Sequence, residues 1–207
     1  MAYTHVDKPI RLGNVEVKNR TFRPAHGTGI GWGEMNDALI AYHEERARGG
    51  VGLIISEIGS VHPSTPLNLN IYNHDIEGGM RKLVDHIKPH GTKLFQQLWH
   101  AGHYLGALDG SPPWSASDIP NVEVGTVPIP MTKGMIDEIV GAYAECGHRM
   151  EQYGLDGVDV HCAHGYLPAQ FFSSNTNKRE DEYGGSFENR TRFIVEMMTA
   201  IRNAVSK

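Results

Sequence analysis

The chain alternates between short apolar runs and longer stretches with helical spacing. Three mostly apolar runs, at 52–56, 93–98 and 157–160, have the character of strands buried on both faces. A weaker fourth candidate lies at 20–24. Strands of this kind occur mainly in parallel sheets, because helices cover their faces. The pattern therefore predicts an α/β fold.

An amphipathic segment follows each predicted strand. Helices are predicted over 36–48, 76–90, 135–153 and 187–205. Thr132 and Ser186 precede the last two and are suited as N-caps, since their hydroxyl oxygens can accept hydrogen bonds from free backbone amides. Glycines end the first three helices, as is typical of helix C-termini, at 49–50, 91 and 154.

Two segments lie outside this alternation. Before the first strand, apolar and polar residues alternate around Gly13-Asn14, which predicts a β-hairpin. After the third predicted strand, the segment 103–131 is rich in Pro, Ser and Gly. It is too long for a simple connection, and we expect a surface loop.

Four consecutive strand–helix units favour a parallel sheet with right-handed crossovers. A doubly wound sheet and a (β/α)₈ barrel both fit this order. Polar residues follow every predicted strand, and barrel enzymes build their sites at those carboxyl ends. The glycine-rich segment 27–33 lacks the strand–turn–helix register of a dinucleotide loop. We expect a TIM barrel, of which this chain supplies about the first four strand–helix units after the hairpin.

Composition narrows the class of partner. The chain has 19 Lys and Arg against 24 Asp and Glu, a formal net charge of -5, and no run of like charges. This balance argues against a nucleic-acid or anionic-membrane surface and favours a small-molecule substrate. Cys146 and Cys162 are the only cysteines, and no apolar leader or membrane-spanning segment follows Met1. We expect a reduced, cytoplasmic protein.

The densest chemistry lies in the sequence VDVHCAHGYLPAQF at 158–171. His161 and His164 are three positions apart, so they can converge only if the strand ends between them and the chain turns. Residues 162–163 and Gly165 permit such a turn. Two imidazoles could then donate hydrogen bonds to one substrate carbonyl oxygen. Tyr166, with an unperturbed pKa of about 10, would keep its proton at neutral pH and could act as a general acid.

Gln97 is a second candidate, because it interrupts an otherwise apolar strand. A buried amide without a partner costs a few kcal/mol. We therefore expect Gln97 to contact a buried hydrogen-bonding ligand.

Four segments together carry a family resemblance. VKNRTFRPAHGTG (17–29), VGLIISE (51–57), FQQLWHAGH (95–103) and the long stretch at 161–193 resemble successive signature segments of the old yellow enzyme family of FMN-dependent oxidoreductases. In detail, PAHGTG (24–29) and HGYLPAQF (164–171) resemble the larger subgroup with 2,4-dienoyl-CoA reductase and trimethylamine dehydrogenase. The resemblance implies that His161 and His164 bind substrate and that Tyr166 donates the proton. It implies flavin contacts from Pro24, Ala25, His26, Ile58 and Gln97.

Two departures from the trimethylamine dehydrogenase pattern refine this expectation. Gly27 stands where that pattern has a cysteine tethering the flavin, so FMN is expected to be non-covalent. Ile58 stands where it has an aromatic cation-binding residue, which argues against an amine substrate.

The activity implied is an ene-reductase reaction, in which an activated C=C bond of an enone or enoyl thioester is reduced at the expense of NADH or NADPH. The family has four further strand–helix units, so residues 1–207 are expected to form the N-terminal part of a barrel domain. We expect a homo-oligomer or association with the missing half. An iron-sulfur cluster, if the protein holds one, is expected outside these residues.

Two alternatives have to be weighed. Twelve of the 207 residues are histidines, and a metal-dependent barrel hydrolase could use a ring of strand-end imidazoles, from His26, His62, His100 and His161. No His-x-His pair of the kind common in such barrels occurs, so no metal site is predicted, and His62, His100 and His103 are expected to be satisfied or surface histidines. The other alternative is a catalytically inert half-barrel.

Overall fold

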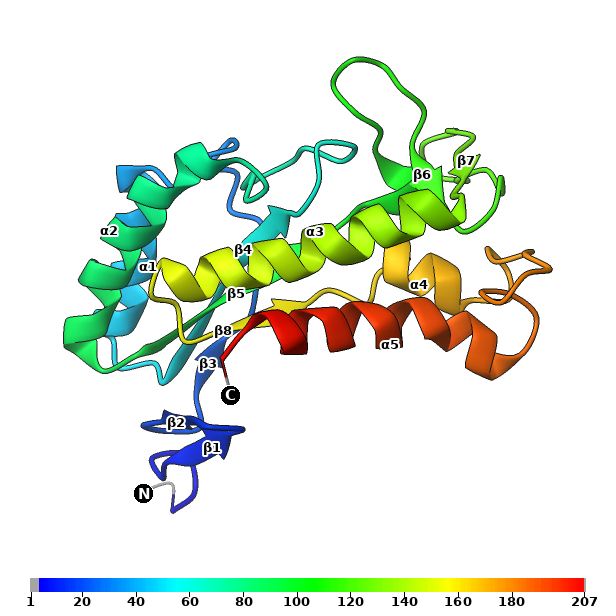
Figure 1. Ribbon diagram of the computed structural model, residues 1–207. Coiled ribbons are helices and arrows are strands. Elements are labelled where there is room, and N and C mark those ends of the chain that lie inside the picture. Colours follow the sequence, from blue (N-terminus) through cyan, green and yellow to red (C-terminus); the bar gives the residue numbers. More distant parts are fainter. Residues whose placement is uncertain (1–3, 207) are drawn as a thin grey trace.

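The computed structural model describes residues 4–206 and contains a four-stranded parallel sheet (Figure 1). The strand order follows the chain, β3 (Phe22–Arg23), β4 (Leu53–Ser60), β5 (Lys93–Trp99) and β8 (Gly157–Val160). All three neighbouring pairs are parallel. The four predicted strands are therefore confirmed, although β3 is only two residues long and β4 runs further than the apolar pattern suggested.

Four long helices pack along one side of this sheet (Figure 1). They are α1 (Asp37–Arg48), α2 (Glu77–Ile87), α3 (Lys133–Gln152) and α5 (Phe187–Ala204). The other side is left open, and its amino-terminal part forms a hollow of about 440 Å³ whose lining includes Phe22, Ile55 and Phe95. A doubly wound sheet would reverse its strand order and carry helices on both faces. The unreversed order and one-sided cover identify part of a barrel.

The helix ends follow the predicted signals. Thr132 accepts a hydrogen bond from the Met135 amide, and Ser186 accepts one from the Asn189 amide, so both predicted caps are confirmed. The segment predicted as one helix over 76–90 is divided. Its centre is α2, and the 3₁₀ turns at His74–Ile76 and Lys88–His90 flank it. Pro89 explains the second turn, because it cannot donate to an α-helical hydrogen bond.

The predicted hairpin is also confirmed. Strands β1 (Ile10–Leu12) and β2 (Val15–Val17) pair in antiparallel fashion around Gly13-Asn14. The hairpin lies below the amino-terminal end of the sheet (Figure 1).

The segment 103–131 is more ordered than a surface loop. It contains β6 (Trp114–Ser115) and β7 (Ile129–Pro130), which pair with each other, after a 3₁₀ turn at Gly102–Tyr104. A further short helix, α4 (Leu167–Phe172), was not predicted. No helix among residues 4–206 combines the length and the apolar character needed to cross a bilayer.

His43 is an unusual member of the core between α1 and the sheet. Its side chain is fully buried, and neither ring nitrogen has a hydrogen-bond partner. Burial, aided by the nearby Arg23 and Arg46, lowers the pKa of His43 to about 3. Burial has the same effect on His100, whose pKa also falls to about 3. Both imidazoles are therefore neutral in the folded protein at neutral pH.

The two buried histidines make stability depend on pH. Because their folded pKa values lie below the ordinary 6.5, the unfolded chain binds protons first as the pH falls. Each histidine then reduces the free energy of unfolding by about 1.4 kcal/mol per pH unit between roughly 6.5 and 3. His43→Leu removes one contribution and should flatten the slope in denaturant titrations at pH 4–6.5. An unchanged slope would contradict the burial of a neutral His43.

Candidate active site

Parallel pairing brings the carboxyl ends of β4, β5 and β8 to one edge of the sheet. After β8 the His161 amide still bonds to the Leu98 carbonyl, at 3.0 Å, and then the chain turns. His164 and Gly165 take left-handed backbone angles, with φ of 56° and 73°, and the Tyr166 amide donates to the Ala163 carbonyl. The turn predicted between the two histidines is therefore confirmed.

The two imidazoles contact each other. The Ala163 amide donates to His161 Nδ1 at 3.3 Å, and His161 Nε2 lies 3.1 Å from His164 Nδ1. Burial lowers the pKa of His161, and the neighbouring His164 acts in the same direction. In a neutral His161 that accepts at Nδ1, the proton is on Nε2 and is donated to His164. One ring, and not two as expected, then keeps a free N–H, at His164 Nε2.

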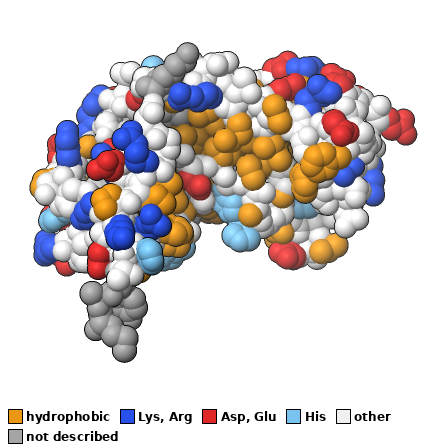
Figure 2. All heavy atoms as spheres, turned by 90° about the horizontal axis from the view of Figure 1, so that it is seen from below, with side chains coloured by type: hydrophobic (Ala, Val, Ile, Leu, Met, Phe, Trp, Pro, Cys, Tyr) orange, Lys and Arg blue, Asp and Glu red, His pale blue; other side chains and the backbone are white. Residues whose placement is uncertain are grey.

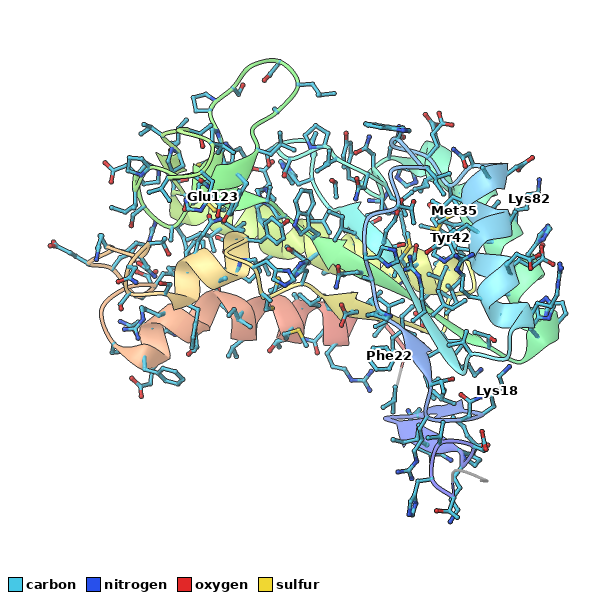
Figure 3. All side chains as sticks on the ribbon, turned by 180° about the vertical axis from the view of Figure 1, so that it is seen from behind. Lys18, Phe22, Met35, Tyr42, Lys82 and Glu123 are labelled. Atoms are coloured by element: carbon cyan, nitrogen blue, oxygen red, sulfur yellow. The ribbon has the colours of Figure 1, made fainter. Side chains whose placement is uncertain are left out.

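Tyr166 lies beside this pair in an aromatic cluster. Its ring contacts Trp99, Tyr104 and His161 edge to face, with centroid distances of 5.2, 5.5 and 4.9 Å. Burial raises the pKa of Tyr166, and Tyr104 and Glu123 raise it further. Glu123 lies in the segment that carries β6 and β7 (Figure 3). The phenol is thus protonated at neutral pH, as a general acid must be.

Sequence reasoning missed Gln170, the side chain that holds this turn in place. It is 1% exposed, and its amide oxygen accepts from the His103 amide and the Ser115 hydroxyl. Its amide nitrogen donates to the carbonyls of Ala101 and Gly165, at 3.1 and 2.6 Å. No signal in the sequence marked it, because the six-residue helix α4 that buries it was not predicted. Gln170 joins the end of β5, strand β6 and the histidine turn.

The residues expected to contact the cofactor lie along the same edge. Ile58 and Gln97 are direct neighbours in the β4–β5 register, and both are half-buried. Pro24 and His26 are exposed after β3, and Ala25 is half-buried. Arg23 Nη2 and the Tyr42 hydroxyl lie 3.5 and 3.4 Å from His26 Nε2.

The argument from an unpartnered buried amide applies to Gln96 and was wrong for Gln97. Gln97 is half-buried on the open face, and its amide nitrogen donates to Asp159 at 2.7 Å. Gln96 points to the other side and is fully buried. Its nitrogen donates to the Glu57 and Gln97 carbonyls, and its oxygen has no partner. Adjacent strand positions face opposite sides, and sequence alone did not show which glutamine faced the helices.

The remaining strand-end histidines are engaged elsewhere. The Ser64 hydroxyl lies 2.8 Å from His62 Nδ1 and 2.9 Å from His100 Nε2, and His62 Nε2 lies 3.1 Å from Glu138. These two are satisfied, as expected. His103 is not, because it is buried and its Nδ1 lacks a partner.

The ring of four imidazoles that a metal-dependent hydrolase would need is not formed. Over residues 4–206, no group of three or more His, Cys, Asp or Glu side chains is placed to hold a metal ion. Glu57, which lies inside β4, accepts from the amide and hydroxyl of Thr28, at 2.7 and 2.8 Å.

Comparison with known proteins identifies the family of this chain. The sequence profile of the NADH:flavin oxidoreductase / NADH oxidase family matches residues 6–207. The chain belongs to this family. It is 37% identical to the NADH oxidase of Thermoanaerobacter brockii over 205 residues, and 36% identical to the NADPH dehydrogenase of Clostridium acetobutylicum over 201 residues. Each alignment covers 95% of this chain but only 32% and 59% of the two relatives.

Solved structures of this family show the same fold. The chain superposes on 2-naphthoyl-CoA reductase with a TM-score of 0.92 at 31% identity, covering 99% of this chain and 34% of that one. For the Old Yellow Enzyme of Pichia sp. AKU4542 the TM-score is 0.89 at 30% identity, with coverage of 99% and 57%. The recognition of the old yellow enzyme family and of a partial TIM barrel is therefore confirmed.

A substitution at Gly102 would test the close packing around Gln170. Its φ is 61°, and a Cβ at this position would lie 2.1 Å from Gln170 Oε1. Gly102→Ala should cost about 2–5 kcal/mol in the free energy of unfolding, because it combines left-handed strain with overpacking. Gly110→Ala is the matched control, since Gly110 has a φ of 85° and nothing within 4 Å of its Cβ position. It should cost only about 1–2 kcal/mol. Equal losses in denaturant unfolding would contradict the close contact.

Proposed function

We propose that the protein containing this chain is an FMN-dependent NAD(P)H oxidoreductase that reduces an activated C=C bond. The observation that carries the proposal is the placement of His164 and Tyr166 at the end of β8, on the same sheet edge as Gln97 and Ile58. One end of the barrel thereby combines a hydrogen-bond donor at His164, a protonated phenol at Tyr166 and a side-chain amide at Gln97 that could contact a flavin. This is the end at which barrel enzymes carry out their chemistry.

The residues present suit a non-covalent flavin. The side-chain oxygen of Gln97, Oε1, has no hydrogen-bond partner among the described residues, and segment 24–26, which follows β3 at the same end of the sheet, offers backbone groups. Ile58 supplies an apolar neighbour for a ring face. Gly27 has no side chain with which to form a tether. Bound FMN would supply the hydride, which it receives from NADH or NADPH.

The residues of the histidine turn would bind and protonate the substrate. His164 Nε2–H would donate to the substrate carbonyl oxygen and stabilise the negative charge that grows there when hydride arrives at the β-carbon. Tyr166 would give its proton to the α-carbon and recover one from solvent. A raised pKa suits this role, because it keeps the phenol protonated between turnovers.

A carbonyl-conjugated alkene is the substrate class that uses both groups. The structural neighbours include a 2-naphthoyl-CoA reductase and a morphinone reductase. A free donor at His164 suits an enone or an enoyl thioester, since both present a carbonyl oxygen next to the double bond. The aliphatic Ile58 offers no aromatic face for an ammonium group.

The first test concerns the cofactor. The purified full-length protein should be yellow, and acid denaturation should release FMN in amounts close to one per chain, measured by absorbance and chromatography of the supernatant. Flavin that stays with the precipitated chain would contradict the non-covalent mode. A protein without flavin would contradict the proposed function itself.

The second test separates the two half-reactions. Tyr166→Phe removes only the proton donor, so stopped-flow reduction of the flavin by NAD(P)H should remain within about twofold. Reoxidation by an enone should slow by about 10²-fold or more, as expected for loss of a general acid. Tyr153→Phe removes a remote phenol near the end of α3 and should change neither rate. Equal slowing of both half-reactions in Tyr166→Phe would contradict its role as proton donor.

We further propose that the open side of the sheet, and the exposed apolar surface of α4 and α5, are covered by more protein, either the rest of a barrel or another copy. Apolar side chains gather across the middle of the face shown in Figure 2. Large exposed ones on α4 and α5 are Phe172, Phe187, Val195 and Met198.

Expressed alone, residues 1–207 should associate or aggregate, because contiguous apolar surface favours burial. Size-exclusion chromatography with light scattering tests this. A stable monomer of 22.9 kDa would contradict it.

A further inference from the structure

Asp159 lies next to the end of β8, directly across from Gln97 in the β5–β8 register. Its carboxylate accepts a hydrogen bond of 2.7 Å from Gln97 Nε2. None of the ion pairs found among residues 4–206 includes Asp159. Gln97 is therefore the donor to which this half-buried carboxylate is joined.

The contact fixes the direction of the Gln97 amide. An ionised carboxylate has acceptors only, so the Gln97 atom that faces it must be the nitrogen. A charge-assisted hydrogen bond is stronger than a neutral one, and reversing the amide would place two oxygens 2.7 Å apart. The side-chain oxygen Oε1 and the second Nε2–H of Gln97 are thus left for another partner, and their positions cannot be exchanged.

We propose that Asp159 is a positioning residue for the flavin, acting through Gln97. The imide edge of a flavin presents one N–H between two carbonyl oxygens. An amide with a fixed oxygen and a fixed second N–H can meet the imide N–H and one adjacent carbonyl together. Asp159 selects that arrangement over the reversed one. The inference rests on the proposed function and adds a residue that neither the strand pattern nor the family resemblance had singled out.

A double-mutant cycle tests the assignment in the full-length protein. Asp159→Asn keeps the size of the side chain but lets the Gln97 amide face either way, since an asparagine amide both donates and accepts. FMN affinity would be measured by fluorescence titration of the flavin-free protein. We expect about tenfold weaker binding, the usual scale for one charge-assisted hydrogen bond. In the Gln97→Ala background the same change should alter affinity less than about twofold, because the group being oriented is gone.

The outcomes of the cycle are distinct. A tenfold loss in both backgrounds would overturn the proposal, since Asp159 would then act on the cofactor or the fold directly. No loss in the presence of Gln97 would also overturn it. The melting temperature of each variant without flavin shows whether a loss of binding comes from unfolding.

A second measurement needs no flavin and separates this inference from the proposed function. In protein with ¹⁵N-labelled glutamine, one Nε2 proton of Gln97 should resonate downfield because it bonds to a carboxylate. It should move upfield in Asp159→Asn, with Gln97→Ala used to assign the signal. An unmoved resonance would overturn the role of Asp159, whereas a protein that shows the shift but binds no FMN would overturn the proposed function and leave only the orientation of the Gln97 amide by Asp159.

Discussion

The parallel pairing of β5 with β4 on one side and β8 on the other is the constraint on which the candidate site depends. Parallel strands in register end at the same edge, so residues far apart in the chain become neighbours there. Gln97 lies beside Asp159 because of the β5–β8 register, and Ile58 lies beside Gln97 because the β4–β5 register shifts by one residue between Ser56 and Ile58. The long helices cover one face of the paired strands. The positions of the side chains at the carboxyl end of the sheet follow from this pairing.

Pairing does not by itself place the histidine turn, because His164 already lies beyond the sheet. The buried amide of Gln170 makes that connection, through the carbonyl of Gly165 at one end and the start of the 103–131 segment at the other. A fully satisfied buried amide resists displacement, since moving any partner would leave a polar group unpaired. The space needed for it explains why position 102 is a glycine.

The parts of this structure that depend on local chemistry could be predicted from the sequence. Apolar runs predicted the strands, hydroxyl caps predicted the starts of α3 and α5, and Gly13-Asn14 predicted the hairpin. The missed features depend on contacts between distant segments. Helix α4 has six residues, too few for a helical period to be recognised. Which of Gln96 and Gln97 faces the open side is decided by strand register, and the role of Gln170 by three segments meeting.

The polarity of the site follows from two partners that have no alternative. A backbone amide can only donate, so His161 Nδ1 accepts from Ala163 and His161 Nε2 donates to His164 Nδ1. The N–H that remains free is then the one on His164 Nε2. An ionised carboxylate can only accept, so Asp159 forces Gln97 to donate and turns its carbonyl oxygen away. One end of the site therefore offers a donor, as the proposed binding of a substrate carbonyl requires, and the other offers an acceptor, as the proposed contact with a flavin imide requires. Each of these hydrogen bonds can form in one direction only. The donor end of the site, after β8, and the acceptor end, on β5, are therefore distinguished by two adjacent strands.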